Sequence, residues 1–377
     1  MKVAAIAAAV ACLLAASAGS QAIPGTYVNF DAPGAQVTNP SGSSSVGTVV
    51  LDMNNLGQVI GLYTNDSSIG IRGFIRDAAG NISLIDAPSA GTPIIHGIKS
   101  LAETRPAAIN DDGVVVGTGH NTIGMPKAFV RFSDGTTGEL PFTGYSTMAT
   151  ALTKHQAGGS FSDGNHWTAF IRNQDGSIIT FNAPDANSTQ SYMGTFVTSI
   201  NVPGAAVGWY YDSNQNTHAY VRSLDGVITE FSAPQAGHTG NTGTFPVRIF
   251  DSGAILGYWL DDNFNSGSFI RLPNGSFLPV ALPQGSSYTA VFIADIDWWG
   301  HFIGVFNDAK GVAHSFYQAA GGRVTIFTDP AAGNVQGQGT VAVRMNQLGD
   351  VTGNYIDSGN ISHGFVWKPL VQTARAH

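Results

Sequence analysis

One short motif recurs along most of the chain, and this repetition constrains the fold more than any other feature. Its clearest copies are "THAYVR", "AHSFYQ" and "SHGFVW", and looser copies are "IRGFIR" and "PKAFVR". Repeats of roughly 20 to 50 residues are typical of solenoids and propellers. The aromatic residue of the motif stands at seven positions that are 41 to 55 residues apart: Phe74, Phe129, Phe170, Tyr220, Phe269, Phe316 and Phe365.

Each repeat contains short stretches of β-branched and aromatic residues separated by turn residues. In the first repeat these stretches are "TVVLDMN", "GQVIGLY", "GFIRD" and "NISLIDAP", and their composition predicts four β-strands. Asp-Gly or Asn-Gly follows the third stretch at positions 134, 175, 225 and 274, which supplies the positive φ angle of a tight hairpin. Four antiparallel strands per repeat predict one blade of a β-propeller.

The two ends of the repeat array indicate how it closes. The seventh repeat stops after its third predicted strand, at Trp367, whereas "YVNFDAP" near the N terminus matches the fourth-strand sequence "SLIDAP". We therefore expect an all-β fold, a seven-bladed β-propeller over residues 23–367, closed by the N-terminal strand, which completes the last four-stranded antiparallel blade and covers its edge. Residues 368–377 are expected to form a C-terminal tail. A solenoid is the alternative, although an open array has no use for such a displaced strand.

The N terminus has the features of a secretory signal peptide. Residues 1–22 place Lys2 ahead of an apolar run and end in small residues, which predicts cleavage and export. No later stretch is apolar over the roughly 20 residues that a transmembrane helix requires, so we expect a secreted protein, extracellular or periplasmic, without membrane insertion. The only cysteine, Cys12, lies in this segment, which excludes disulfides, thiolate metal sites and cysteine nucleophiles from the mature chain.

The His-small-aromatic element, with an upstream segment such as "MNNLGQVIGLY" or "INDDGVVVGTG", resembles the HAF repeats of bacterial extracellular proteins. The resemblance covers essentially the whole mature chain, and the third repeat, "LTKHQAGGSFSDGNHWTAF", departs from it most. It implies secretion and a propeller-like fold. It implies no particular reaction or substrate, and it assigns no catalytic residue.

Charge argues against nucleic acid as a partner. The formal net charge is −8, only 11% of residues are charged, and no basic stripe interleaved with aromatic residues is present in the sequence. We expect a monomer that binds an extracellular polysaccharide or protein ligand, and we expect no cofactor and no metal.

Residue types that recur in most repeats are expected to belong to the scaffold. Three repeats carry a histidine two positions before the aromatic residue, and we expect structural hydrogen bonds there, with metal ligation as the alternative: His218, His314 and His363. Arginines that follow the aromatic residue by two positions are expected to stack or pair between blades: Arg76, Arg131, Arg172, Arg222 and Arg271. Charges of alternating sign on the innermost strands predict a salt-bridged plug, with a substrate site as the alternative: Arg248, Asp295, Arg344 and Asp52.

In propellers one face gathers the loops between strands two and three and the links between blades, and ligands usually bind there. Aromatic rings near Asn, Ser and Thr suit the apolar faces and hydroxyl groups of sugars. The alternative is that each ring only caps the hydrophobic layer between blades. The candidate ligand-binding residues at this mouth are Tyr63, Tyr192, Tyr210, His238, Trp259, Tyr288 and Tyr355.

No motif of a serine hydrolase, zinc protease, phosphate-binding loop or dinucleotide site is present in the sequence. "DDNFNSG" and "DSNQN" alternate Asp and Asn as calcium loops do, but solvated turns explain them as well. Whether the chain is an enzyme stays open. The alternative to simple binding is a polysaccharide lyase that cleaves a uronate-containing glycan by β-elimination, which needs a cation beside the uronate and His or Tyr for proton transfer. The candidates are Arg105 or Lys99 for the cation, His120 or His96 as base and Tyr145 as acid.

Overall fold

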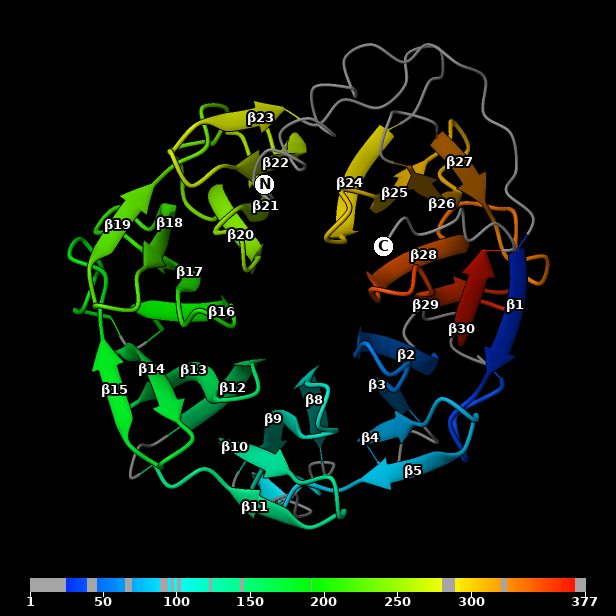
Figure 1. Ribbon diagram of the computed structural model, residues 1–377, viewed down its shortest axis with the longest axis horizontal. Helices are drawn as coiled ribbons and strands as arrows, with labels where there is room; N and C mark the ends of the chain where they lie inside the picture. The colour runs from blue at the N-terminus through cyan, green and yellow to red at the C-terminus, as the bar shows by residue number, and fades with distance from the viewer. Residues whose placement is uncertain are drawn as a thin grey trace. The chain divides into compact units, whose positions relative to one another are not determined.

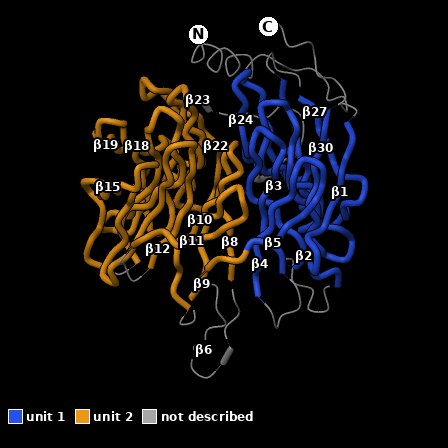
Figure 2. Tube along the Cα trace, turned by 60° about the horizontal axis from the view of Figure 1, so that its bottom comes forward, with its two compact units in different colours: residues 1–85, 280–377 blue, residues 86–279 orange. Residues whose placement is uncertain are grey.

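The computed structural model describes residues 25–38, 46–64, 70–88, 94–95, 98–99, 103–121, 124–142, 146–190, 192–279, 289–319 and 324–369. The predicted signal peptide lies outside these residues, and so does the predicted tail beyond Pro369. The chain divides into two compact units, unit 1 with residues 1–85 and 280–377 and unit 2 with residues 86–279 (Figure 2). Among the described residues, none belongs to a helix long and apolar enough to cross a membrane.

Unit 1 consists of four-stranded antiparallel sheets, three of them among its described residues. The first contains β24 (Thr289–Ile296), β25 (Phe302–Asn307), β26 (Ala313–Gln318) and β27 (Val324–Phe327). The second contains β28 (Gly339–Met345), β29 (Val351–Ile356), β30 (Ile361–Pro369) and β1 (Gly25–Phe30). The third contains β2 (Val46–Met53), β3 (Val59–Thr64), β4 (Ile71–Arg76) and β5 (Ile82–Ile85).

Unit 2 repeats the same pattern in four sheets of its described residues (Figure 1). They are β8 (Thr104–Ile109), β9 (Val115–His120), β10 (Pro126–Arg131) and β11 (Thr137–Glu139); β12 (Ser146–Leu152), β13 (Gln156–Ser162), β14 (Trp167–Asn173) and β15 (Ile178–Phe181); β16 (Thr195–Ile200), β17 (Ala206–Tyr211), β18 (Thr217–Arg222) and β19 (Ile228–Phe231); and β20 (Gly243–Ile249), β21 (Ile255–Leu260), β22 (Ser266–Arg271) and β23 (Phe277–Pro279). The short strands β6 (Ile94–Ile95) and β7 (Ile98–Lys99) form a separate hairpin.

The strand predicted near the N terminus pairs, as expected, with the third strand of the last repeat. β1 runs antiparallel to β30, with Tyr27 opposite Trp367 and Phe30 opposite Gly364. β1 is therefore the fourth strand of the sheet that β28, β29 and β30 begin, and β30 continues two residues past the predicted end at Trp367.

A glycine in the second strand of every described sheet accounts for the recurring aromatic residue. In β3, a Cβ atom added to Gly61 would lie 2.6 Å from the ring of Phe74 on β4, so that ring lies directly across the glycine. Burial of a Phe side chain stabilises the fold by roughly 1.5–3 kcal/mol. The same contact recurs between Gly117 and Phe129, Gly159 and Phe170, Gly208 and Tyr220, Gly257 and Phe269, Gly304 and Phe316, and Gly353 and Phe365.

A β-bulge interrupts the first strand of every described sheet at the same position of the repeat. In β2 the pairing with β3 passes from Val50 to Asp52, so that Leu51 has no partner. A bulge bends the strand and increases its twist. The other skipped residues are Ala107, Thr150, Thr198, Val247, Ala294 and Val343.

A Gly-Thr pair at the start of several first strands joins each sheet to the one before it. Gly243 has a φ of 132° and pairs with Thr217 of β18, and a Cβ atom there would collide with the carbonyl of Thr217. Thr244 Oγ1 accepts a hydrogen bond of 2.8 Å from the backbone N–H of Ala233, in the link between β19 and β20. The hydroxyl thereby fixes the point at which the chain enters the next sheet. The same threonine bond recurs at Thr48, Thr195 and Thr340.

Candidate functional site

In sheet β16–β19 the motif histidine lies between an aromatic ring and two hydrogen-bonding side chains. His218 of β18 stacks on Tyr210 of β17, with ring centroids 5.3 Å apart. Its Nε2 lies 3.1 Å from Asp212 Oδ2, and its Nδ1 lies 3.0 Å from Ser232 Oγ. A carboxylate only accepts hydrogen bonds, so Nε2 donates to Asp212, and in the neutral ring Nδ1 accepts from the Ser232 hydroxyl.

The same arrangement occurs in sheet β24–β27 of unit 1. His314 stacks on Phe306 with centroids 5.4 Å apart. Its Nε2 lies 3.3 Å from Asp308 Oδ2, and its Nδ1 lies 3.0 Å from Thr328 Oγ1.

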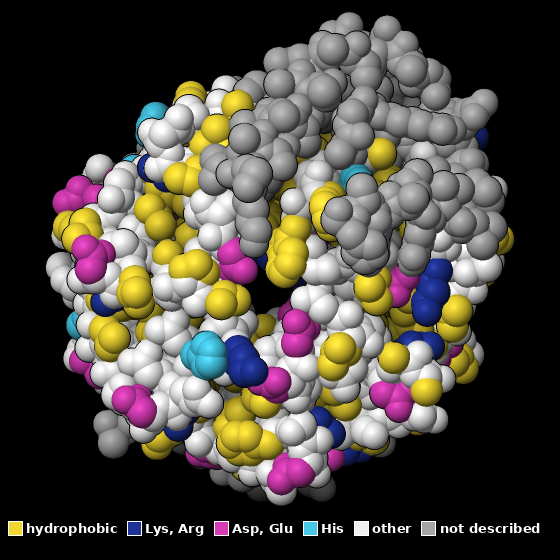
Figure 3. Space-filling model, in the orientation of Figure 1, with side chains coloured by type: hydrophobic (Ala, Val, Ile, Leu, Met, Phe, Trp, Pro, Cys, Tyr) yellow, Lys and Arg dark blue, Asp and Glu magenta, His cyan; other side chains and the backbone are white. Residues whose placement is uncertain are grey.

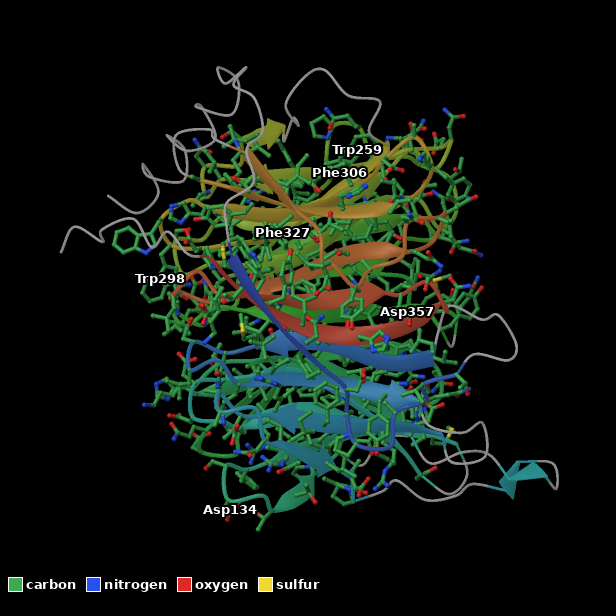
Figure 4. The ribbon with its side chains drawn as sticks, turned by 90° about the vertical axis from the view of Figure 1, so that its right-hand side faces the viewer. Asp134, Trp259, Trp298, Phe306, Phe327 and Asp357 are labelled. Carbon is green, nitrogen blue, oxygen red and sulfur yellow. The ribbon has the colours of Figure 1, made fainter. Side chains whose placement is uncertain are left out.

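The third copy joins the N-terminal strand to its sheet. His363 of β30 stacks on Tyr355 with centroids 4.8 Å apart, and its Nδ1 lies 3.0 Å from both oxygens of Asp31, just after β1. Its Nε2 lies 3.5 Å from Asp357 Oδ2, in a turn at one end of the sheet (Figure 4). The hydrogen bond to Asp31 raises the pKa of His363 above its ordinary value. The expected structural hydrogen bonds of the motif histidines are thus confirmed, and the described residues hold no group of three or more His, Cys, Asp or Glu arranged for a metal ion.

The His218 copy adjoins a cavity. A cavity of about 380 Å³ lies beside His218. Glu230 lines this cavity from β19, and Asp185 lines it from the link between β15 and β16. The backbone N–H of Asp185 donates a hydrogen bond of 3.1 Å to Glu230 Oε1. The cavity thus combines two aromatic rings with five oxygen-bearing side chains. Its lining residues are Asp185, Tyr210, Asp212, His218, Glu230, Phe231 and Ser232.

Negative charge dominates the electrostatics of this cavity. Burial, together with the nearby carboxylates of Glu230, Asp185 and Asp212, raises the pKa of Tyr210, so its hydroxyl stays protonated. Burial alone would raise the pKa of Asp212, but hydrogen bonds from Asn216 and His218 outweigh it and lower that pKa below its ordinary value. At neutral pH, therefore, Asp212 is a carboxylate and Tyr210 can donate a hydrogen bond.

A second described cavity lies at the turns of sheets β12–β15 and β16–β19. Its volume is about 570 Å³. The polar side chains of this cavity bond to one another, His155 Nδ1 to Gln174 Oε1 at 3.0 Å and Gln156 Nε2 to Asn173 Oδ1 at 2.9 Å. In both cavities polar side chains bond to one another, but only the cavity beside His218 also has the half-buried ring of Phe231 and several carboxyl groups in its lining, so it is the stronger candidate.

The structure brings together two of the residues proposed for a lyase. Arg105 Nε and His120 Nδ1 lie 3.0 and 3.2 Å from the same atom, Glu103 Oε2. The histidine contact has the distance of an ion pair, but it lacks the geometry of a hydrogen bond. Arg105 therefore faces a carboxylate in an exposed ion pair, and a uronate would have to compete with Glu103 for it. His96, Tyr145 and the side chain of Lys99 lie outside the described residues.

The predicted ligand-binding aromatics fall into different environments. Tyr63, Tyr210 and Tyr355 are buried, with exposed fractions of 1%, 3% and 7%, which corrects the expectation that they present open ring faces. Second-strand side chains alternate between the two faces of the sheet, and these three pack into the core. Trp259 is half-buried beside Gly267, whereas Tyr192 and His238 are exposed. Tyr288 lies outside the described residues.

The predicted salt-bridged plug is present locally in unit 1. Arg344 Nε lies 3.0 Å from Asp52 Oδ1. Asp295 is fully buried, and it accepts backbone hydrogen bonds from Ile296 and Met345. The carboxylates of Asp52 and Asp295 raise the pKa of Arg344 despite the opposing effect of burial. Arg248 lies in unit 2, where its guanidinium stands over the ring of Phe250.

Two other sequence expectations are settled by contacts. Three of the five motif arginines stack on the fourth-strand ring of the preceding sheet, as expected, with 4.6 to 5.0 Å from Cζ to the ring centroid: Arg76 on Phe30, Arg222 on Phe181 and Arg271 on Phe231. The Asp-Asn segments that resemble calcium loops are closed turns. Asp261 Oδ1 accepts the backbone N–H groups of Asn263 and Asn265, as Asp212 Oδ1 does for Asn214 and Asn216.

Asp185 and Glu230 were not predicted as cavity residues, and an exposed tryptophan pair was not predicted either. Trp298 and Trp299 are 53% and 52% exposed in the turn between β24 and β25, and Trp298 lies at the other end of the sheets of unit 1 from Asp357 (Figure 4). Glu230 could have been noticed in the sequence. It stands opposite the motif aromatic Tyr220, at the position that Ile326 holds opposite Phe316 in another repeat.

Comparison with known proteins supports the fold. No protein-family model matches the sequence, and no curated protein sequence matches it. Among solved structures, the BP39L lectin from Burkholderia pseudomallei aligns with a TM-score of 0.54 at 11% identity, over 86% of this chain and 98% of that chain. The β-propeller domain of the Trilobed protease from Pyrococcus furiosus aligns with a TM-score of 0.51 at 12% identity, over 87% and 99%.

A structure from a study of two prolyl endopeptidases aligns with a TM-score of 0.54 at 11% identity, over 82% of this chain but only 46% of that one. This chain therefore spans less than half of that enzyme's length. At such identities the likeness shows the fold alone, and the fold is an all-β one of four-stranded sheets, like that of β-propellers.

Proposed function

We propose that this protein is a secreted carbohydrate-binding β-propeller. In this proposal the sheets of both units are the blades of one seven-bladed ring, and the pairing of β1 with β30 completes the last blade. The predicted signal peptide and the resemblance to HAF repeats support export. Charged side chains are scattered over only a minor part of the described surface visible in Figure 3, which suits a ligand rich in hydroxyl groups.

The cavity beside His218 carries the proposal. Sugar-binding sites combine an aromatic ring, which packs on the apolar face of a pyranose, with side chains that bond to several hydroxyl groups. Here the half-buried Phe231 supplies a ring, while Glu230, Asp185 and Ser232 supply hydrogen-bonding groups within one cavity. The solved lectin structure that aligns over most of this chain is consistent with such a role, although its likeness concerns the fold.

A binding experiment with a matched control tests the proposal. Purified protein is titrated with a panel of oligosaccharides by calorimetry, and Glu230→Ala is compared with Glu139→Ala. Glu139 of β11 stands opposite the motif aromatic Phe129 exactly where Glu230 stands opposite Tyr220, but its sheet carries Lys127 at the histidine position. Loss of glycan binding in Glu230→Ala alone supports the proposal. Binding to no member of the panel, or equal binding by both variants, overturns it.

A further inference from the structure

We propose that strand β1 is a pH-controlled clasp, which is closed while His363 is protonated and is released locally from β30 when this histidine loses its proton. The clasp strand is β1 together with Asp31, the residue that follows it. The contact between Asp31 and His363 joins residues that are 332 positions apart in the sequence. The clasp is separate from the cavity beside His218, so it does not depend on carbohydrate binding.

The partners of His363 require a proton on both ring nitrogens. Its Nδ1 lies 3.0 Å from both oxygens of Asp31, and its Nε2 lies 3.5 Å from Asp357 Oδ2. A carboxylate only accepts hydrogen bonds, and a neutral imidazole carries a single N–H. The neutral ring would therefore turn a lone pair toward one of the two carboxylates. The imidazolium form has a proton for each of them, so it is the form that fits this site.

The other two motif histidines have a different partner on Nδ1. At His218 and His314 this nitrogen faces a hydroxyl at 3.0 Å, that of Ser232 or Thr328. A hydroxyl can donate as well as accept, so it satisfies the neutral ring. Asp31 follows β1 just as Ser232 follows β19 and Thr328 follows β27. Of the three copies, therefore, this one makes the hold on its outer strand depend on protonation of the histidine.

Acidic groups face His363 from three elements of unit 1. Asp31 follows β1, Asp357 lies between β29 and β30, and Asp329 lies in the link between β27 and β28. Burial and these three carboxylates raise the pKa of Tyr355, on which His363 stacks, to about 12, so its hydroxyl stays uncharged while His363 titrates. The hydrogen bond to Asp31 raises the pKa of His363 against the opposing effect of burial, and Asp357 adds to the rise.

The remaining contacts of the clasp strand hold it weakly enough for local release. Every residue of β1 is half-buried or exposed, and strands with few buried side chains open at low free-energy cost. Asn29 Nδ2 donates a hydrogen bond of 3.2 Å to Asp329 Oδ1, but Asp329 is 1% exposed and its Oδ2 has no hydrogen-bond partner. A buried oxygen without a donor is costly, which destabilises the closed state. Other repeats have alanine at the position of Asp329: Ala32, Ala87, Ala183 and Ala233.

The direction of the pH effect follows from linkage. The closed state binds the proton of His363 more tightly than the released state does. Its stabilisation by the proton is therefore fully present below the released-state pKa, and it is lost as the pH rises through the raised closed-state pKa. Release thus occurs on the alkaline side. It uncovers the edge of β30, and an uncovered strand edge can pair with another strand.

Hydrogen exchange of the purified protein tests the clasp. Mass spectrometry follows the backbone amides of β1 at about pH 5.5 and at about pH 9, and each exchange rate is divided by that of an unstructured peptide at the same pH. Since a hydrogen bond to a charged group changes an equilibrium constant by about tenfold or more, the protection of β1 is expected to fall at least about tenfold. The internal control is β19, the outer strand that Ser232 follows, whose protection should stay constant.

Two variants assign the effect to the proposed contact. Asp31→Ser reproduces the arrangement at His218, and it should make the protection of β1 independent of pH. His363→Gln should give the lower protection of β1 at both pH values. Constant protection of β1 in the wild type, an equal fall in β19, or a pH dependence that persists in Asp31→Ser overturns the proposal. Exchange of β1 only together with the core strand β29 overturns local release. Wild-type β1 and β19 decide the outcome even where a variant fails to fold.

Discussion

Arg344 of β28 and Asp52 of β2 join two neighbouring sheets of unit 1 through an ion pair of 3.0 Å between Nε and Oδ1. The two side chains are partly buried, with exposed fractions of 23% and 15%, and the fully buried Asp295 adds to the field on the arginine. Removing one partner of a buried pair leaves an uncompensated charge, which typically costs about 3–5 kcal/mol. We expect Arg344→Ala to lower the free energy of unfolding by about 3 kcal/mol in urea titrations. Adding Asp52→Ala should recover part of this loss, and an unchanged stability of the single variant would contradict the coupling.

The contact of His363 with Asp31 predicts a pH dependence of stability. The folded-state pKa of His363 is raised above 6.5, chiefly by its hydrogen bond to Asp31. The contribution of protonated His363 to the free energy of unfolding is therefore fully present below the unfolded-state pKa, and it is lost as the pH rises through the raised folded-state pKa. We expect the stability difference between wild type and His363→Gln to be largest near pH 5.5 and to shrink by pH 9. Chemical denaturation across this range measures it, and a difference that stays constant with pH would rule out the protonated histidine as its source.

The close approach of ring and glycine in sheet β8–β11 predicts a steric cost. A Cβ atom on Gly117 would lie 2.8 Å from both the Phe129 ring and the Cα of Pro106. Because overpacking a core typically costs about 1–3 kcal/mol, we expect Gly117→Ala to lower the free energy of unfolding by at least about 2 kcal/mol. The matched control is Gly138→Ala in the same sheet, where a Cβ atom meets nothing within 4 Å. Equal stabilities of the two variants would refute the packing argument.

The threonine hydroxyl at the start of β20 predicts a hydrogen-bond effect that is separable from packing. Thr244 is fully buried, and its Oγ1 accepts the N–H of Ala233. Thr244→Val keeps the shape but leaves a buried donor unsatisfied, at a cost of about 1–3 kcal/mol. Thermal unfolding should show a lower Tm for Thr244→Val and a smaller change for Thr244→Ser, which retains the hydroxyl. A lower Tm for Thr244→Ser than for Thr244→Val would indicate that packing of the methyl group stabilises the fold more than the hydrogen bond does.

The strands were predictable because their signals are local and occur in most repeats. Alternating β-branched residues, the Asp-Gly turns and the displaced fourth-strand sequence each repeat a physical requirement, so one weak copy is supported by the others. The pairing of Tyr27 with Trp367 follows from this logic, although 340 positions separate the two residues.

The bulges and the cavity were not predictable, because no residue type that recurs in the repeats marks them. The skipped residues include Leu51, Ala107 and Thr150, which share no residue type, so the bulge leaves no trace in composition. Burial of Tyr210 depends on which face of β17 it occupies, and aromatic character alone does not reveal this. Glutamate stands at this position in two repeats, as Glu139 and Glu230, and what sets Glu230 apart appears only once Asp185 is seen beside it.

The pairing of β1 with β30 also governs the order in which the sheet can form during synthesis. β1 is the earliest described strand to leave the ribosome, and its partner, residues 361–369, is the latest. During translation, therefore, β1 stays unpaired until residues 361–369 have emerged, and its sheet cannot be completed before then. Any product that ends before residue 361 would leave β1 without this partner, so the pairing distinguishes a chain that contains β30 from one that lacks it.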